Sequence, residues 1–304
     1  MRPLLIDTDP GIDDALALLL ALASPDCSVE AITTVAGNVE VPLCTRNAKR
    51  VVAVAAPLRS PCIVEGAATP LARPLRTAVH YHGADGLGGA LPPEAPSPPP
   101  APGSAARTLV QMARRMGQML TVVAIGPLTN LALALELDAP ALAGIGRLVV
   151  MGGAVEVPGN VTPTAEFNMY VDPEAADRVV AADLPLELIP LDVTQRVILR
   201  QPALEAALRS APSGLADFVS TVTRFAFRVE AVSGTPGITL HDPLAVGVAL
   251  DPSFVTFERV RLEIGAGGET RRCPGPPNCR VAVAVEAERF VPWFLERLCR
   301  ASSS

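Results

Sequence analysis

The sequence predicts an α/β fold: a mostly parallel central sheet with helices on both faces, followed by a more helical C-terminal part. Short apolar runs rich in Val, Ile and Leu alternate with helical patterns up to residue 190. Strands of a parallel sheet are buried on both faces, so they are expected to be apolar throughout rather than alternating. Hydrophobic residues form 49% of the 304-residue chain, which is enough for one large core.

The expected elements follow one another in strand–helix order. Apolar runs predict strands at 3–6, 29–35, 62–64, 120–125, 147–151 and 186–190. Helical spacing of apolar residues predicts intervening helices at 13–23, 43–56, 105–117, 128–137 and 173–182. The last of these begins at "DPEAAD", where Asp172 is an N-cap and a proline occupies the first helical position. Further helices are expected at 202–209, 214–231, 242–250 and 287–299, and strands at 254–264 and 280–286.

A proline-dense stretch, "LPPEAPSPPPAPG", interrupts this order at 91–103. Proline lacks the backbone donor that regular structure needs, so we expect a mobile surface loop there. The strand–helix alternation resumes after it, which argues against a linker between domains. The sequence therefore predicts a single domain over 1–304.

Charge and cysteine usage narrow the class of protein. The net charge is −6 and no block of Lys or Arg stands out, so nucleic acid is not an expected partner. The apolar run after residue 14 is about half the roughly 20 residues of a membrane span and has no basic flank, so neither a membrane helix nor a signal peptide is expected. The six cysteines lack the paired spacing of a zinc site. We expect free thiols in a cytoplasmic protein.

Four carboxylates crowd into "DTDPGIDD": Asp7, Asp9, Asp13 and Asp14. The first two end a predicted strand, and the other two fall in the first turn of a helix, where the dipole favours anions by only ~0.3–1 kcal/mol each. Carboxylates packed together raise one another's pKa unless a positive charge intervenes. A divalent cation held by oxygen ligands would supply that charge. Simple helix capping is the alternative, but capping needs one acid and not four.

Other polar residues follow the remaining strands or begin a later helix. Ligands bind outside the carboxyl ends of parallel strands, so these residues should meet at one edge of the sheet. The set expected there is Asp7, Asp9, Asp13, Asp14, Asn38, Asn160, Glu166, Asn168, His241 and Asp242. Such convergence from distant segments predicts a binding site.

The three histidines lie in "VHYHGADG" and "LHDP". Imidazole titrates near neutral pH and can donate a proton to a leaving group. We expect His241 and His82 to be functional and His80 to be structural.

Six motifs in order resemble one family, the inosine–uridine-preferring nucleoside hydrolases. They are "DTDPGIDDALAL", "AITTVAGNV" with "TRNA", "HGADGLGG", "GPLTNLALAL", "VMGGA" with "PGN" and "AEFNMYVDPEAA", and "HDPLAV". The resemblance spans essentially the whole chain. It implies a Rossmann-like nucleoside hydrolase fold, hydrolysis of ribonucleosides to ribose and free base in nucleoside salvage, and a homodimer or homotetramer.

The resemblance also implies roles for individual residues. A Ca²⁺ ion would be held by three carboxylates and one backbone carbonyl, those of Asp9, Asp14, Asp242 and Ile125. Asp9 would also be the general base for a calcium-bound water, and His241 would lie near the leaving base. Asp7 would orient the ligands from behind. Substrate would be bound by Asp13, Asn38, His82, Asn160, Glu166 and Asn168. These acids would stabilise an oxocarbenium-like transition state.

One helix departs from the family pattern. Some members carry tyrosines and an arginine before the "HDP" motif, but this chain has "RFAFRVEAVSGTPGITLHD", with Phe225, Phe227 and Arg228 and no tyrosine. Its two tyrosines, Tyr81 and Tyr170, lie elsewhere in the sequence, so nothing here identifies the leaving-group acid. The single tryptophan, Trp293, is expected in the core rather than beneath a base.

Two alternatives remain at this point. The altered helix would also suit a nucleoside-binding protein of the same fold without turnover. The "DTD" spacing also occurs in Mg²⁺-dependent phosphatases with an Asp nucleophile. Those enzymes need a lysine near the phosphoryl group, and Lys49, the only lysine, lies in a predicted helix that suits this role poorly.

Overall fold

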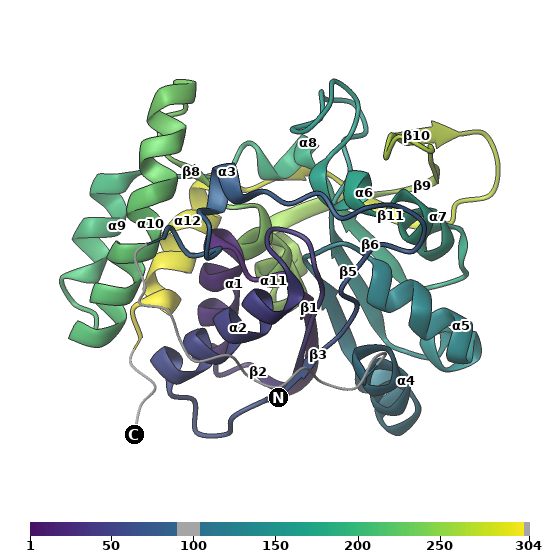
Figure 1. Cartoon of the computed structure of the whole chain (residues 1–304), viewed down its shortest axis with the longest axis horizontal. Coiled ribbons are helices and arrows are strands. Elements are labelled where there is room, and N and C mark those ends of the chain that lie inside the picture. Colours follow the sequence, from purple (N-terminus) through teal and green to yellow (C-terminus); the bar gives the residue numbers. More distant parts are fainter. Residues whose placement is uncertain (90–103, 301–304) are drawn as a thin grey trace.

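Nine strands form the central sheet in the computed structural model, which describes residues 1–89 and 104–300 (Figure 1). From edge to edge they are β10 (Thr270–Cys273), β9 (Val255–Ile264), β11 (Cys279–Val285), β6 (Leu186–Ile189), β5 (Arg147–Met151), β4 (Thr121–Ala124), β1 (Arg2–Thr8), β2 (Cys27–Thr34) and β3 (Cys62–Glu65). All neighbours from β11 to β3 are parallel, and β9 is antiparallel to both β10 and β11. The prediction of a mostly parallel sheet is confirmed.

Helices cover both faces of this sheet. Successive residues of a strand point to opposite faces, so each strand contributes side chains to both layers. Leu4 and Ile6 of β1 pack on the face that carries α1 (Ile12–Ala23), α2 (Val41–Ala55), α11 (His241–Leu250) and α12 (Ala287–Leu298). Leu5 packs on the other face, which carries α4 (Ser104–Met116), α5 (Thr129–Ala143) and α7 (Pro173–Ala181). The α9 (Gln201–Leu208) and α10 (Ser213–Ser233) helices extend the first layer outward (Figure 1).

Strand β1 lies at a reversal of the chain path. It pairs with β2 on one side and β4 on the other, so the chain runs outward through β2 and β3 before returning to β4, β5 and β6. Asp7, near the carboxyl end of β1, is paired with Ala124, the last residue of β4. Ligands bind at such switch points in open α/β sheets. The fold therefore places the acidic N-terminal stretch at a natural binding position.

Most of the expected elements are present, and the differences are short elements or shifted ends. The structure adds α3 (Val79–His82), α6 (Phe167–Val171), α8 (Leu191–Thr194), β7 (Ile198–Leu199), β8 (Ile238–Thr239), β10, and 3₁₀ turns η1 (Gly117–Met119) and η2 (Pro252–Phe254). None spans enough residues to show a clear period in sequence. The predicted helix 128–137 continues to Ala143 through a kink at Asp138. The predicted proline-rich loop, 91–103, lies outside the described residues.

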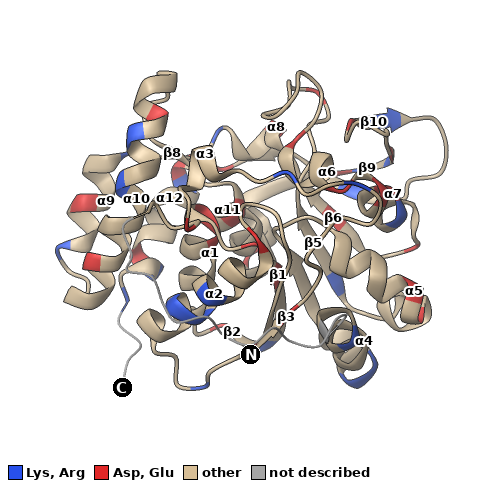
Figure 2. Cartoon of the chain, viewed as in Figure 1, with Lys and Arg blue, Asp and Glu red and all other residues tan. Residues whose placement is uncertain are grey.

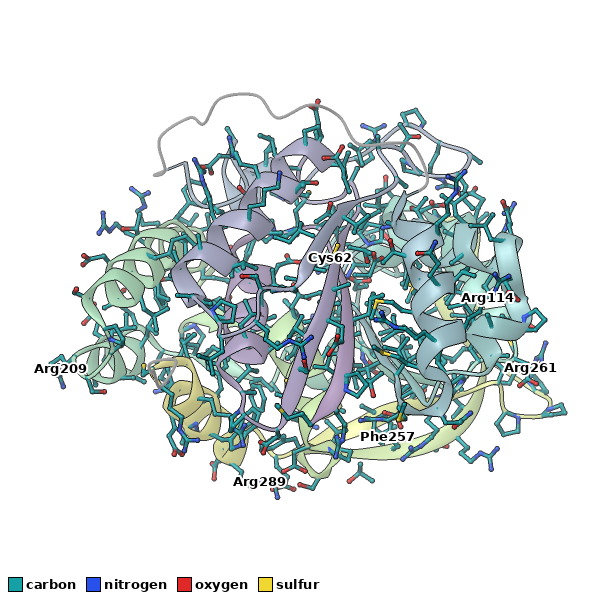
Figure 3. All side chains as sticks on the ribbon, turned by 90° about the horizontal axis from the view of Figure 1, so that it is seen from below. Cys62, Arg114, Arg209, Phe257, Arg261 and Arg289 are labelled. Carbon is teal, nitrogen blue, oxygen red and sulfur yellow. The ribbon has the colours of Figure 1, made fainter. Side chains whose placement is uncertain are left out.

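Most charged side chains lie at the periphery, but several acids are buried. Figure 3 shows Arg114, Arg209, Arg261 and Arg289 at the outer rim of the molecule. Figure 2 shows acidic positions gathered at the centre, where β1, α1 and α11 meet. All six cysteines are free thiols, as expected. Within the described residues, no helix is long and apolar enough to cross a membrane.

Trp293 packs among core aromatic side chains. Its ring lies 4.8 Å from that of Phe254 and 5.8 Å from that of Phe290, centroid to centroid. Trp293 is thus half-buried against the core and does not line the cavity described below.

Candidate active site

The four N-terminal acids are buried at the end of β1 and in the first turn of α1. Asp7, Asp9 and Asp14 are fully buried, and Asp13 is 8% exposed. Asp14 is the most strongly anchored. One of its oxygens accepts from the Thr8 hydroxyl at 2.5 Å, and the other accepts from the backbone N–H of Gly11 at 2.9 Å and the side-chain amide of Asn38 at 3.0 Å. The start of α1 therefore fixes one carboxylate at the switch point.

Asp242 reaches this cluster from the first turn of α11. One carboxylate oxygen from each of Asp13, Asp14 and Asp242 lies within 4.8 Å of the others. Burial raises the pKa of all three, to about 7 for Asp13, and their mutual repulsion adds to the effect for Asp13 and Asp242. Three oxygen donors so close together, with raised pKa values, fit a divalent cation.

Asp9 lies beside this trio without joining it. One of its oxygens accepts from the backbone N–H of Asn38 at 2.7 Å, and the other is buried without a hydrogen-bond partner among the described residues. A Cβ at Gly37 or Gly126 would lie 2.1 or 2.7 Å from these oxygens, so both glycines are needed for the carboxylate to fit. Burial and then the charge of Asp14 raise the pKa of Asp9. An unpartnered buried oxygen next to three acids also fits a cation, or a water that it holds.

Asp7 contacts none of the other acids directly. Its Oδ1 accepts from the hydroxyl of Thr33 at 2.5 Å and from the side-chain amide of Asn130 at 2.8 Å. These bonds tie β1 to β2 and to α5, and burial raises the pKa of Asp7 to about 7. Asp7 is thus placed behind the site, where it holds the end of β1.

One side of the site faces the acids and is called the amide wall here. It consists of Asn160, Glu166 and Asn168. Glu166 caps α6 by accepting from the backbone N–H of Asn168 at 2.9 Å, and it also accepts from that of Gly153 at 3.0 Å. The side chain of Asn168 donates to the backbone carbonyl of Ile125 at 3.2 Å, so this carbonyl faces the same site. Asn160 accepts from the N–H of Phe167 at 3.0 Å. The short helix α6 therefore positions the expected ribose-binding residues.

Of the two functional candidates among the histidines, His82 is buried and His241 is half-buried. His82 accepts from the backbone N–H of Ile12 at Nδ1 (3.0 Å), which places its proton on Nε2. Burial lowers the pKa of His82 to about 3 and that of His241 to about 4. The hydroxyl of Thr194, on α8, lies 2.7 Å from Nδ1 of His241. The lowered pKa values favour the neutral form of both rings near neutral pH, and a neutral ring can still donate a hydrogen bond to a departing base.

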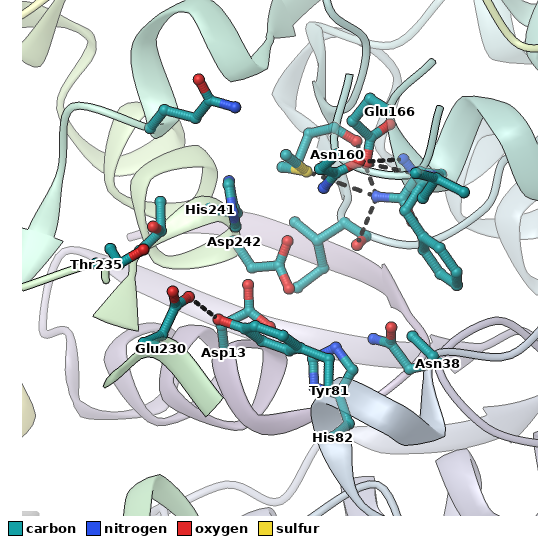
Figure 4. A pocket seen from close by; sticks show the side chains of 18 of the residues that line it. Asp13, Asn38, Tyr81, His82, Asn160, Glu166, Glu230, Thr235, His241 and Asp242 are labelled. Carbon is teal, nitrogen blue, oxygen red and sulfur yellow. Dashed lines mark hydrogen bonds between the residues drawn. The ribbon is translucent and has the colours of Figure 1, made fainter. Parts of the chain in front are cut away.

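One cavity of about 470 Å³ unites these residues (Figure 4). Of the predicted set, its lining includes Asp13, Asn38, His82, Ile125, Asn160, Glu166, Asn168, His241 and Asp242. Asp7, Asp9 and Asp14 are fully buried and are not among the residues that line it. His80, expected to be structural, also lines the cavity. The structure therefore brings together residues that the sequence separates by more than 200 positions.

Sequence reasoning missed several polar residues of the cavity, namely Tyr81, Gln195, Glu230, Thr235 and Thr239. Tyr81, on α3, lines it and donates to Glu230, in the last turn of α10. The cavity thus has a tyrosine, although it comes from a different element than in the family pattern. Arg228, the arginine of the helix that departs from the family pattern, lines a separate groove between α9 and α10. Glu230 continues the buried face of α10, since Val222 and Ala226 precede it at intervals of four. That spacing is the signal that could have identified it.

Comparison with known proteins identifies the family of the chain. Residues 4–292 match the family described as "Inosine-uridine preferring nucleoside hydrolase". The chain is 37% identical to the pyrimidine-specific ribonucleoside hydrolase RihA of Salmonella typhimurium over 97% of this chain and 98% of that protein. Among solved structures it resembles a plant nucleoside hydrolase, PpNRh1 (35% identity, TM-score 0.90, 98% and 99% covered). It also resembles a purine-preferring ribonucleoside hydrolase from Gardnerella vaginalis (29% identity, TM-score 0.92, 98% of both chains).

Proposed function

The chain belongs to the inosine–uridine preferring nucleoside hydrolase family and is an enzyme of that class; from this premise we propose how its residues divide the reaction. The substrate is a ribonucleoside, and the products are ribose and the free base. The observation that carries the proposal is the meeting of Asp242 with Asp13 and Asp14 beside a cavity of about 470 Å³. No lysine or arginine is among the residues described as lining this cavity, which suits a neutral nucleoside better than a nucleotide.

A divalent cation, which we propose to be Ca²⁺, fits the acidic cluster. Asp14 and Asp242 would hold it with Asp9 and the carbonyl of Ile125, and the position of Asp13 within the trio makes Asp13 a further candidate ligand. When bound, the cation would offset the repulsion among the acids, orient the ribose hydroxyls and make water easier to deprotonate. Fixed oxygen donors in a buried site are what such a hard cation prefers.

The protein's own groups account for the other steps. The C1′–N bond breaks with its electron pair leaving on the base, and positive charge develops on the ribose ring. The buried carboxylates stabilise that charge. Water adds to C1′, and the unpartnered oxygen of Asp9 accepts its proton. Asn160, Glu166 and Asn168 hold the ribose hydroxyls. The neutral rings of His82 and His241 hydrogen-bond the departing base, which takes up one proton at the freed nitrogen, and Asp9 releases the proton that it took from water to solvent, so that ribose and the neutral base leave.

A panel of ribonucleosides, assayed for reducing sugar with and without a chelator, tests this proposal. We expect release of ribose from at least one purine or pyrimidine ribonucleoside, and its loss when the cation is removed. Tight nucleoside binding with no free base from a calcium-loaded sample would instead support the binding protein without turnover. Phosphate release from a phosphomonoester without base release would support the phosphatase alternative.

A further inference from the structure

A tyrosine–glutamate pair forms one side of the cavity and has no role in the reaction described above. The hydroxyl of Tyr81 donates to Oε1 of Glu230 at 2.5 Å, joining α3 to α10 across 149 positions of sequence. Both side chains line the cavity, and the bond between them is drawn in Figure 4.

The position of Glu230 is costly for a carboxylate. It is only 8% exposed and lies in the last turn of α10, where the helix dipole disfavours negative charge. No lysine or arginine is among the described residues that line the cavity, and Arg224 and Arg228 of the same helix line the groove toward α9 instead. Tyr81 contributes one hydrogen bond in partial compensation. Glu230 is thus a carboxylate that lines the cavity with one protein donor and with its second oxygen not among the buried oxygens that lack a partner, which is a position suited to binding a ligand.

Glu230 lies at the end of the cavity away from the amide wall. In Figure 4, Asn38, Asn160 and Glu166 occupy one side and Glu230, Thr235 and His241 the other, with Asp13 and Asp242 between them. A nucleoside with its ribose over the acids and against the amide wall would extend its base toward Glu230. The pair therefore faces the base, not the sugar.

The Tyr81–Glu230 pair can accept a hydrogen bond from a ligand but has no proton left to donate. Tyr81 has one proton, and that proton is donated to Glu230. Burial, followed by the bond to Glu230, raises the pKa of Tyr81 well above its usual range, so the proton stays in place. Oε2 of Glu230 has no hydrogen-bond partner in the part of the chain that the structure describes. A ligand here must supply the donor.

We propose that Glu230, held in position by Tyr81, is a specificity-determining residue that accepts a hydrogen bond from an N–H group on the leaving base. This inference rests on the proposed function and names its substrate class: ribonucleosides whose base carries a ring N–H or amino group on the edge remote from the glycosidic bond. Tyr81 is a positioning residue, because it acts through Glu230.

Matched substrates with and without this donor test the inference. Inosine and uridine carry a ring N–H, whereas purine riboside and 3-methyluridine do not. The kcat/KM of Glu230→Gln for inosine and uridine should fall by about 10- to 100-fold, the range expected for a hydrogen bond to a charged group. For the two substrates without the donor, the kcat/KM of Glu230→Gln should stay within about threefold of the value for the unaltered enzyme. The four bases differ in how readily they leave. This difference cancels because the kcat/KM for each substrate is compared between the variant and the unaltered enzyme.

Two further variants separate specificity from structure. Asp217→Asn removes an exposed carboxylate from the same helix and should leave all four rates unchanged. Tyr81→Phe should lower the rates for inosine and uridine by a smaller factor, about threefold to tenfold, and spare the other two. An equal loss on all four substrates, or no loss on any, overturns the inference. If the unaltered enzyme hydrolyses none of them, the proposed function itself fails, and the two failures are thereby distinguished.

Discussion

The backbone N–H of Asn38 donates a 2.7 Å hydrogen bond to one carboxylate oxygen of Asp9, while the other oxygen of Asp9 is buried without a partner among the described residues. The bond fixes the carboxylate and leaves one oxygen to act. Asp9→Asn should therefore lower kcat by about 10²- to 10⁴-fold, the usual contribution of a general base, while the fold is retained. Ribose release and the thermal unfolding curve measure the two effects. Asp177→Asn, an exposed change on α7, is the control, and near-normal hydrolysis by Asp9→Asn would contradict the assignment.

Removal of the cation should lower both stability and activity. A ligand that binds only the folded state at 100 times its Kd stabilises the protein by about 2.7 kcal/mol. Chelation should thus lower the Tm by about 5 °C or more and abolish ribose release, and added Ca²⁺ should restore both. Asp242→Asn should need a higher Ca²⁺ concentration for the same effect. A Tm and a rate that are both indifferent to chelator would exclude a cation from the acidic cluster.

The hydroxyl of Thr194 should matter only through the ring of His241, which it contacts at 2.7 Å. Thr194→Val should lower kcat/KM by about fivefold, the worth of one neutral hydrogen bond, and His241→Ala by about 10²-fold. The double variant should be no slower than His241→Ala alone. A further loss in the double variant would show that Thr194 acts independently of His241.

Asp172 should stabilise the fold with little part in the chemistry. This fully buried carboxylate caps α7 through the N–H of Ala175 at 3.0 Å, and it accepts from the Thr129 hydroxyl at 2.6 Å and the N–H of Leu71 at 2.9 Å. Asp172→Ala leaves these donors without their acceptor and should cost about 2–4 kcal/mol in the free energy of unfolding. Urea denaturation measures the change. Asp172→Asn keeps one acceptor oxygen and should cost less; equal losses would argue against this explanation.

Thiol reactivity should divide the cysteines by burial. Burial raises the pKa of Cys27 to about 12 and also raises that of Cys44, whereas Cys62 is exposed on β3. At pH 8 a thiol of pKa 12 is ionised in only about one molecule in 10⁴. A thiol reagent followed by mass spectrometry should therefore modify Cys62 in the native protein and reach Cys27 and Cys44 only after unfolding. Rapid native labelling of Cys27 would show that β2 opens locally.

The sheet and the acidic cluster could be predicted because apolar strands are a strong local signal and because ligands bind at the carboxyl ends of parallel strands. Uniformly apolar strands indicated a parallel sheet, and the rule for strand ends placed Asp9, Asp14 and Asp242 at one edge. The resemblance to a family added the cation, which the spacing of acids alone left open against capping.

The rest of the site depends on elements with weak local signals. The α3 and α6 helices have four and five residues, too few to show a helical period, yet they position Tyr81 and Asn168. Glu230 occupies an inward position on an otherwise apolar face, and one charged residue does not disturb the pattern of a 21-residue helix. Which acids form the tight trio also depended on packing: the structure groups Asp13 with Asp14 and Asp242.

The acidic trio also determines when the site can form during synthesis on the ribosome. Asp13 and Asp14 precede Asp242 by more than 200 residues, so they leave the ribosome well before it. A nascent chain can form β1 and α1 early, but it cannot complete the cluster until α11 has left the exit tunnel. The proposed cation could therefore be held by all three acids only after α11 has been synthesised.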